Sequence, residues 1–198
     1  MAQVRPSVSE LLQQPGGWHC HRASQVVAAG GVIAYPTEAV WGLGCNPWDE
    51  MAVERIYGLK VRPMRKGLIL VAADIQQLDF LFSVLPGALR TKAQSHWPGP
   101  VTLLVPDPEG QIPQRVKGEN STIAVRVSAH PLVRRLCQAV GGPLVSTSCN
   151  PAGHEPARRA WQVHKYFPQG LDMVVPGSLG GLRQPSQIID LETGRRLR

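Results

Sequence analysis

Apolar and polar residues alternate along this chain in two patterns, one typical of β-strands and the other of α-helices. Strands are predicted where apolar residues repeat at every second position or run continuously between glycines and prolines. The predicted strands are 31–36, 67–73, 100–106, 122–127 and 143–148, with weaker ones at 171–175 and 186–191. The predicted helices, in which apolar residues recur three or four positions apart, are 49–60, 74–82, 86–95 and 130–140. Because helices and strands interleave, and several strands follow one another without a helix, we expect an α/β fold with a mixed sheet.

Two of the predicted helices also carry end signals. Asp49 precedes the helix 49–60 and can cap its first turn, and Pro131 stands at the first position of the helix 130–140, where a missing backbone N–H does no harm. The strand 67–73 is a continuous apolar run, which is typical of a strand covered on both faces.

The period of two within the strands separates polar from apolar positions. In the strand 122–127, Thr122, Ala124 and Arg126 share one face, and in the strand 143–148, Ser146 and Ser148 share a face. One interpretation is a solvated sheet face. The other is a ligand surface, because small side chains let a ligand lie close and a fixed arginine can bind an anion with two hydrogen bonds.

A cluster of cations precedes the apolar strand 67–73. Lys60, Arg62, Arg65 and Lys66 fall within seven positions. They indicate either a solvated basic loop or a site for an anionic group at the end of a strand. The composition agrees with an anionic partner, since 21 Lys and Arg against 14 Asp and Glu give a net charge of +7.

The length of 198 residues is typical of a single domain, which we take as 1–198. The first 14 residues have no apolar core of a signal peptide, and no run reaches the roughly 18 apolar residues of a membrane helix, so we expect a cytoplasmic protein without a membrane partner. Four cysteines without a C-x-x-C pair are expected to be free thiols. His19, Cys20 and His21 lack a second ligand pair at zinc-like spacing, so no metal site is predicted.

Other stretches leave alternatives open. The usual nucleotide fingerprints are absent, so a nucleotide site must use another design. Glu38, in "YPTEAVWGLGC", could act as a base or could orient a neighbouring cation. The loop "STSCNPAG" at 146–153 is either a turn or a hydroxyl-rich ligand loop at a strand end. A nucleophilic Cys45 or Cys149 would need a paired histidine, which the sequence cannot place.

Six ordered motifs bring these features together. They are "VIAYPTEAVWGLGC", "LKVRPMRKGLILVAA", "HWPGPVTLLVP", "IAVRVSAHPLV", "PLVSTSCNPAG" and "PSQIIDL", and from about residue 20 onwards the chain closely resembles the YrdC-type family of threonylcarbamoyl-AMP synthases. The resemblance implies a twisted mixed parallel and antiparallel sheet, flanked by helices around a basic concave cavity. It also implies a nucleotidyltransferase that converts ATP, L-threonine and bicarbonate to threonylcarbamoyl-adenylate and pyrophosphate. The product would serve N6-threonylcarbamoylation of adenosine 37 in tRNA, through a tRNA threonylcarbamoyl transferase complex.

The resemblance also assigns residues. Lys60 and Arg62 match the family's K-x-R pair and are the expected catalytic residues, with Mg²⁺ expected to bridge the phosphates of ATP. The threonine-binding set is Thr37, Arg126 and Ser146. The ATP-binding set is Lys60, Arg62, Lys66, Thr122, Ser148 and Arg198. Where many longer relatives carry a histidine this chain has Val71, and Arg198 is its last residue.

A module that binds tRNA or ribosomal RNA without catalysis is the alternative function. It would share the basic charge but would not need Thr37, Arg126 and Ser146 together. RNA binding through phosphates falls steeply with salt, and a nucleotide site would depend on a few cations far more than on the others.

Overall fold

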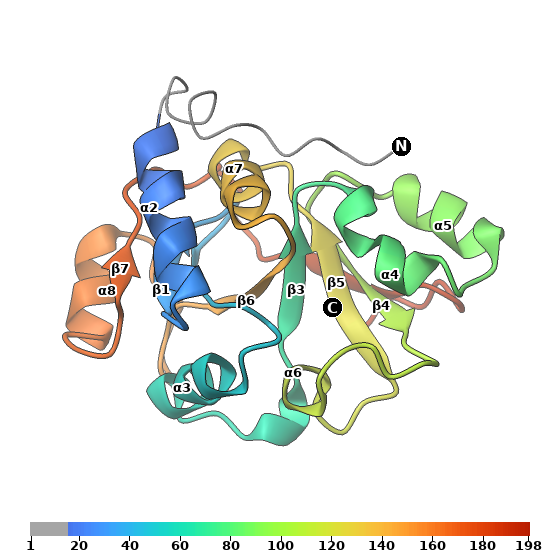
Figure 1. Cartoon of the computed structure of the whole chain (residues 1–198), viewed down its shortest axis with the longest axis horizontal. Coiled ribbons are helices and arrows are strands. Elements are labelled where there is room, and N and C mark those ends of the chain that lie inside the picture. The colour runs from blue at the N-terminus through green and yellow to red at the C-terminus, as the bar shows by residue number, and fades with distance from the viewer. Residues whose placement is uncertain (1–15) are drawn as a thin grey trace.

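The computed structural model describes residues 16–198, and its centre is one eight-stranded sheet (Figure 1). The strand order is β7-β1-β2-β6-β3-β5-β4-β8. The bounds are β1 Ile33–Pro36, β2 Trp41–Gly44, β3 Ile69–Ala72, β4 Val101–Pro106, β5 Thr122–Val127, β6 Leu144–Ser148, β7 Met173–Val174 and β8 Gln187–Asp190. The pairs β1–β7, β3–β5 and β4–β8 are parallel and the others are antiparallel. The predicted mixed α/β sheet is confirmed.

Helices lie on both faces of this sheet (Figure 1). α2 and α7 pack side by side on one face, where they cover Ile33 and Tyr35 of β1 and Val71 of β3. The remaining helices contribute to a second apolar cluster on the opposite face, which includes Leu70 of β3 and Val125 of β5. Their bounds are α2 Gly17–Ala28, α3 Glu50–Lys60, α4 Asp79–Phe82, α5 Gly87–Gln94, α6 Gln114–Lys117, α7 Pro131–Val140 and α8 Ala160–Tyr166, with short 3₁₀ turns at Met64–Lys66 and Ile75–Leu78.

The end signals read from the sequence act as expected. The Asp49 carboxylate accepts a hydrogen bond from the Ala52 N–H at 3.0 Å and so caps α3. Pro131 occupies the first turn of α7, and Gly141 ends that helix with a φ of 82°, a left-handed conformation that glycine adopts without strain.

The residue pattern of the strands decides where the sheet stays uncovered. On β6, Leu144 is packed under α7, whereas Ser146 and Ser148 on the same face line a cavity. On β5, Ile123 and Val125 belong to the core on the opposite face, while Arg126 lines the cavity. One face of the sheet is therefore covered by α2 and α7 over part of its width and open at the hydroxyl and arginine positions.

Several elements were not predicted from the sequence. These are α2, α6, α8 and β2, and the last of them reads Trp-Gly-Leu-Gly. The four cysteines are free, as expected, and they are buried. None of the helices in residues 16–198 is long and apolar enough to cross a membrane. The signal-peptide prediction concerns residues 1–14, which lie outside the described part.

Candidate active site

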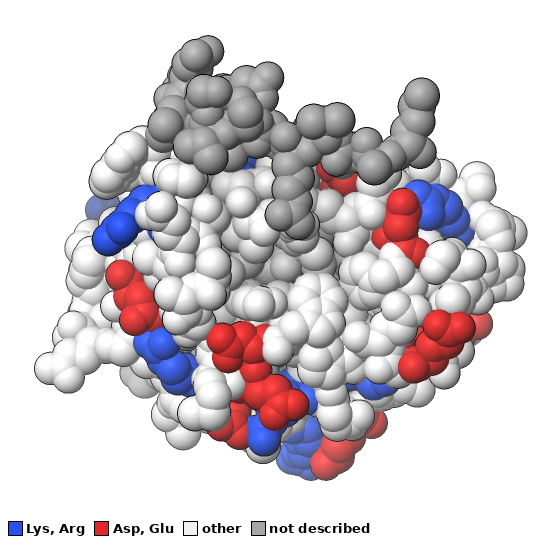
Figure 2. Space-filling model, in the orientation of Figure 1, with Lys and Arg blue, Asp and Glu red and all other residues white. Residues whose placement is uncertain are grey.

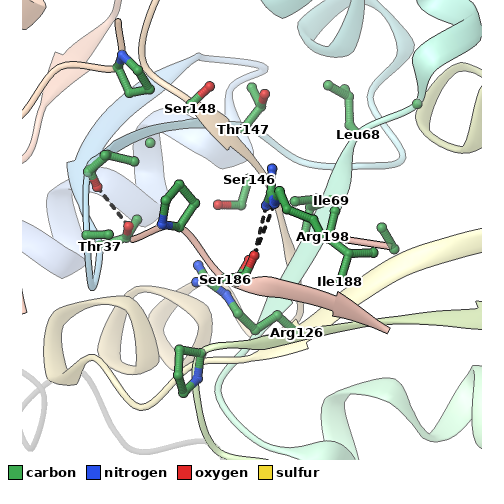
Figure 3. Close-up of a pocket in the computed structure, with 18 of the residues that line it drawn as sticks. Thr37, Leu68, Ile69, Arg126, Ser146, Thr147, Ser148, Ser186, Ile188 and Arg198 are labelled. Atoms are coloured by element: carbon green, nitrogen blue, oxygen red, sulfur yellow. Dashed lines mark hydrogen bonds between the residues drawn. The ribbon is translucent and has the colours of Figure 1, made fainter. Parts of the chain in front are cut away.

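A cavity of about 370 Å³ opens on the uncovered part of the sheet. Strands β2, β3, β4, β5, β6 and β8 contribute to its wall, together with the end of α6 and the loops after β1, α3 and α6. Figure 3 shows how side chains from these distant segments surround one space. Eight predicted site residues line it: Thr37, Arg62, Lys66, Thr122, Arg126, Ser146, Ser148 and Arg198.

Arg126 is held by a buried carboxylate. Its Nη1 lies 3.1 Å from Glu38 Oε2, and the two side chains are 10% and 7% exposed. The Ser128 hydroxyl donates to Glu38 Oε1 at 2.6 Å and accepts the His130 N–H at 3.1 Å. Burial by itself raises the pKa of Glu38, but Arg126 and the Ser128 hydrogen bond outweigh it and hold the pKa below its usual value. Of the two interpretations of Glu38, this geometry favours the one that orients a cation.

Hydroxyl groups lie beside this ion pair. Thr37 Oγ1 donates to the Val40 carbonyl at 2.7 Å, which fixes its rotamer and leaves its oxygen free to accept a further hydrogen bond. Ser146 stands on β6, with its hydroxyl in the same region of the cavity as Thr37 and Arg126 (Figure 3). A cation with two nearby hydroxyls is a suitable receptor for a small amino acid, because the arginine can pair with its carboxylate.

Cations from two separate segments of the chain line another part of the wall. Arg62 Nη2 donates to the Gly67 carbonyl at 2.9 Å, and Lys66 lies next to it in the chain. Lys117, the last residue of α6, also lines this part, and its carbonyl approaches Gly67 so closely that a methyl group on that glycine would lie 2.6 Å away. Gly67 has a φ of 59°, so both its conformation and this close approach require glycine.

The structure adds Lys117 to the predicted site. Its Nζ is 2.9 Å from Asp107 Oδ2, and this pair is mostly buried, with 12% and 1% of the side chains exposed. Asp107 also accepts the N–H groups of Gln111 and Ile112. No sequence pattern pointed to Lys117, because it lies 51 positions from Lys66 and outside every motif.

Lys60 does not have the place that its motif suggested. It is 4% exposed and is absent from the cavity wall, and its ammonium group turns inward toward the end of β6. Its Nζ donates to the Ser148 carbonyl and, at 2.9 Å, to the Asn150 carbonyl. Burial, followed by the charge of Arg62, lowers the pKa of Lys60 to about 8. The arrangement makes Lys60 an internal support of the Ser148 strand end, and the prediction of direct phosphate contact is not supported by it.

The conformation of Val61 explains why Lys60 and Arg62 diverge. Val61 is the only non-glycine residue in the described chain with a positive φ, 50°, and it ends α3. After this left-handed turn the chain leaves the helix, so Lys60 stays on the buried face while Arg62 reaches the cavity. A β-branched residue in this conformation is unusual, which is why the sequence did not indicate the turn.

Arg198 is tied to the cavity wall although it is the last residue. Its guanidinium donates to the Ser186 carbonyl from Nε at 3.2 Å and from Nη2 at 3.0 Å (Figure 3). Its carbonyl accepts the Ile188 N–H at 3.2 Å, which joins it to β8. Burial and the charge of Arg126 lower the pKa of Arg198.

Two other predictions concern residues away from the wall. Val71, where the resemblance led us to expect the histidine of longer relatives, is fully buried in the cluster under α2 and α7. Burial raises the pKa of both Cys45 and Cys149 to about 12, so neither thiol is poised as a nucleophile. Among the described residues, no group of three or more His, Cys, Asp and Glu is arranged to hold a metal ion.

Known proteins resemble this chain over most of its length. The family model Sua5_yciO_yrdC, described as "Telomere recombination", matches residues 25–198. A threonylcarbamoyl-AMP synthase of Marinobacter nauticus is 62% identical over 176 residues, which are 89% of this chain and 93% of the relative. Another, from Stutzerimonas stutzeri, is 54% identical over 183 residues, covering 92% and 98%.

Solved structures show the same architecture. P. abyssi Sua5 complexed with L-threonine matches with a TM-score of 0.82 at 32% identity, over 90% of this chain and 52% of that one. The present chain therefore spans about half the length of that protein. E. coli YciO matches with a TM-score of 0.77 at 29% identity, over 90% of this chain and 87% of YciO.

Proposed function

This chain belongs to the Sua5/YciO/YrdC family, and on that premise we propose that it is a threonylcarbamoyl-AMP synthase. The observation that carries the proposal is one cavity with two kinds of anion receptor. A buried Arg126–Glu38 pair lies beside hydroxyls in one part, and Arg62, Lys66 and Lys117 line another. Relatives that are 54% and 62% identical over most of their length carry that name.

We propose that L-threonine binds at Arg126, Ser146 and Thr37. The guanidinium would pair with the carboxylate of threonine, and Glu38 would keep the guanidinium in position through their 3.1 Å contact. Because Glu38 is ionised and engaged by Arg126, it acts as a positioning residue in this proposal rather than as a base. The amine of threonine would then face the part of the cavity that is proposed for ATP.

ATP is proposed to occupy the part of the cavity lined by cations. Arg62 and Lys66 would neutralise the triphosphate, Thr122 and Ser148 would donate hydroxyl hydrogen bonds, and Arg198 would contribute a further charge. Glu38 is the only acid in the described cavity wall, and it is occupied by Arg126. Mg²⁺ is therefore proposed to enter with ATP, held by phosphate oxygens, which matches its usual binding to nucleotides.

The proposed reaction is a nucleotidyl transfer. The amine of threonine and bicarbonate give an N-carboxylate with loss of water. An oxygen of this carbamate attacks the α-phosphorus of ATP, a new P–O bond forms, and the bond to the β-phosphate breaks so that pyrophosphate leaves with both bonding electrons. Two anions must approach each other, so the contribution of the protein is orientation and neutralisation of charge.

We propose further that the single domain 1–198 works in the cytoplasm and passes its product to the tRNA threonylcarbamoyl transferase complex. RNA binding remains the competing function. On the face shown in Figure 2, most Lys and Arg side chains (blue) lie next to Asp or Glu side chains (red). Arg115, for example, contacts both Glu50 and Glu54. Paired charges of this kind bind an RNA backbone less well than a continuous basic surface.

Pyrophosphate release tests the proposal. The purified protein is given Mg²⁺-ATP, with L-threonine and bicarbonate supplied singly and together. Pyrophosphate is expected only when all three substrates are present, and mass spectrometry should detect the adenylate. Release that does not depend on threonine, or no release together with salt-sensitive RNA binding, would exclude the synthase.

A further inference from the structure

In the part of the cavity wall where Thr37 and Ser146 lie, one position has no side chain. Gly42 of β2 pairs with Tyr35 of β1 on one side and with Ser148 of β6 on the other. A methyl group on Gly42 would lie 3.3 Å from Thr37 Cγ2, 3.6 Å from Ser146 Oγ and 3.6 Å from the Thr147 carbonyl. Gly42 therefore leaves a recess between Thr37 and Ser146, and a single methyl group would occupy it.

The other glycine of β2 has a different role. A methyl group on Gly44 would lie 2.6 Å from the Val145 carbonyl and 2.7 Å from the Tyr35 ring. Its space is thus already filled by the protein, and glycine is needed there for packing. At Gly42 the nearest contact, 3.3 Å to the Thr37 methyl, is tight but is relieved by a shift of a few tenths of an ångström, and the backbone is outside the left-handed region. Alanine could fold at that position, so folding alone does not require glycine there.

The chemistry around the recess matches one kind of side chain. One wall is the methyl group of Thr37, and the other is polar, formed by the Ser146 hydroxyl and the Thr147 carbonyl. A β-carbon that carries one methyl and one hydroxyl meets both walls, with the methyl on the apolar side and the hydroxyl within reach of hydrogen-bonding partners. Glu38, next to Thr37 in the chain, holds Arg126 in the wall of the same cavity.

We propose that Gly42 determines the amino-acid specificity of the site. Because Gly42 has no side chain, the recess stays free for the side chain of a β-hydroxy amino acid. This inference rests on the proposed function and adds the feature that distinguishes threonine from smaller and larger amino acids. Gly42 acts by shape, and no chemical step is assigned to it.

The first test is Gly42→Ala. The added methyl takes the space of the substrate's methyl, so kcat/KM for L-threonine should fall roughly tenfold or more, the scale of one methyl group in a tight pocket. L-Serine lacks that methyl and should lose less, so the threonine-to-serine preference should fall by roughly tenfold. The KM for ATP should not change, and circular dichroism and thermal melting verify that the variant is folded.

A second variant, Thr37→Ser, tests the opposite wall and does not depend on Gly42→Ala folding. It keeps the hydroxyl that donates to Val40 and removes only the methyl group at 3.3 Å from the added carbon. The recess widens, so 3-hydroxy-L-valine, which is threonine with one more methyl on its β-carbon, should gain relative to threonine. Gly58→Ala is the matched control, because Gly58 lies in α3 with nothing within 4 Å of the added methyl, and its kinetics should equal those of the wild type.

The outcomes separate this inference from the proposed function. If the wild type releases no pyrophosphate with ATP, threonine and bicarbonate, the function itself is wrong. If the wild type is active but both variants keep its preferences among threonine, serine and 3-hydroxy-L-valine, the synthase stands and Gly42 does not determine specificity. A changed preference with an unchanged KM for ATP supports the inference.

Discussion

Removing the amine of Lys60 should destabilise the protein, contrary to what is expected of a cation at the mouth of a surface site. In Lys60→Met, the carbonyls of Ser148 and Asn150 lose the Nζ donor inside the protein. A buried acceptor without a partner costs about 1–3 kcal/mol. The loss is partly offset because a charge is no longer buried, and we expect a net loss of about 2 kcal/mol. For a domain of this size that lowers the melting temperature by about 4–8 °C.

The pH dependence of this difference identifies its cause. The pKa of Lys60 in the folded protein is about 8, below the value of about 10.4 in an unfolded chain. Between these values the unfolded protein binds more protons, so the stability contributed by this site rises with pH. The difference in melting temperature between wild type and Lys60→Met should therefore widen from pH 7 to pH 10.

Lys66→Met is the matched control, because Lys66 is exposed on the neighbouring turn. Its stability should stay within about 0.5 kcal/mol of the wild type at each pH. Differential scanning calorimetry on the three proteins is sufficient. If Lys60→Met melts like Lys66→Met and the gap is independent of pH, Lys60 does not support β6, and direct contact with phosphate becomes the better interpretation.

The remaining predictions concern the two parts of the cavity. Arg126→Ala should weaken threonine binding by about 2–4 kcal/mol, which appears as a higher KM for threonine. Arg126→Lys should recover only part of this binding energy. Glu38→Gln should raise the same KM without changing that of ATP, since it loosens Arg126; an equal effect on both substrates would contradict the positioning role. Arg62→Ala should lower turnover by roughly 10²-fold, whereas the exposed Arg65, which is outside the cavity wall, should be nearly silent on change to alanine. Equal effects at Arg62 and Arg65 in pyrophosphate release would favour a diffuse RNA-binding surface.

The strand periodicity was the most informative part of the sequence. The strand 122–127 was predicted with its observed bounds, and its Thr122, Ala124 and Arg126 row lines the cavity. Alternation alone identified the polar face but could not decide between solvent and ligand, because that depends on which helices cover the face. The family motifs favoured a ligand surface over a solvated face, and the cavity at this face is consistent with a ligand surface.

β2 shows why some elements could not be predicted. Its sequence Trp-Gly-Leu-Gly has two glycines, which weaken a strand on local grounds. It forms because β1 and β6 pair with it on both sides, so the tertiary structure overrides the local preference. The structure explains both glycines, since Gly44 allows tight packing against Tyr35 and Gly42 leaves the recess in the cavity.

The divergence of Lys60 and Arg62 shows the limit of a motif as a guide to roles. Spacing in the K-x-R pair suggested two cations acting together on phosphate. The left-handed turn at Val61 separates them, so that one cation supports the backbone that carries Ser148 and the other lines the cavity. Both residues can then be essential for the same reaction for different physical reasons. Stability measurements at Lys60 and substrate kinetics at Arg62 distinguish those reasons, whereas activity alone does not.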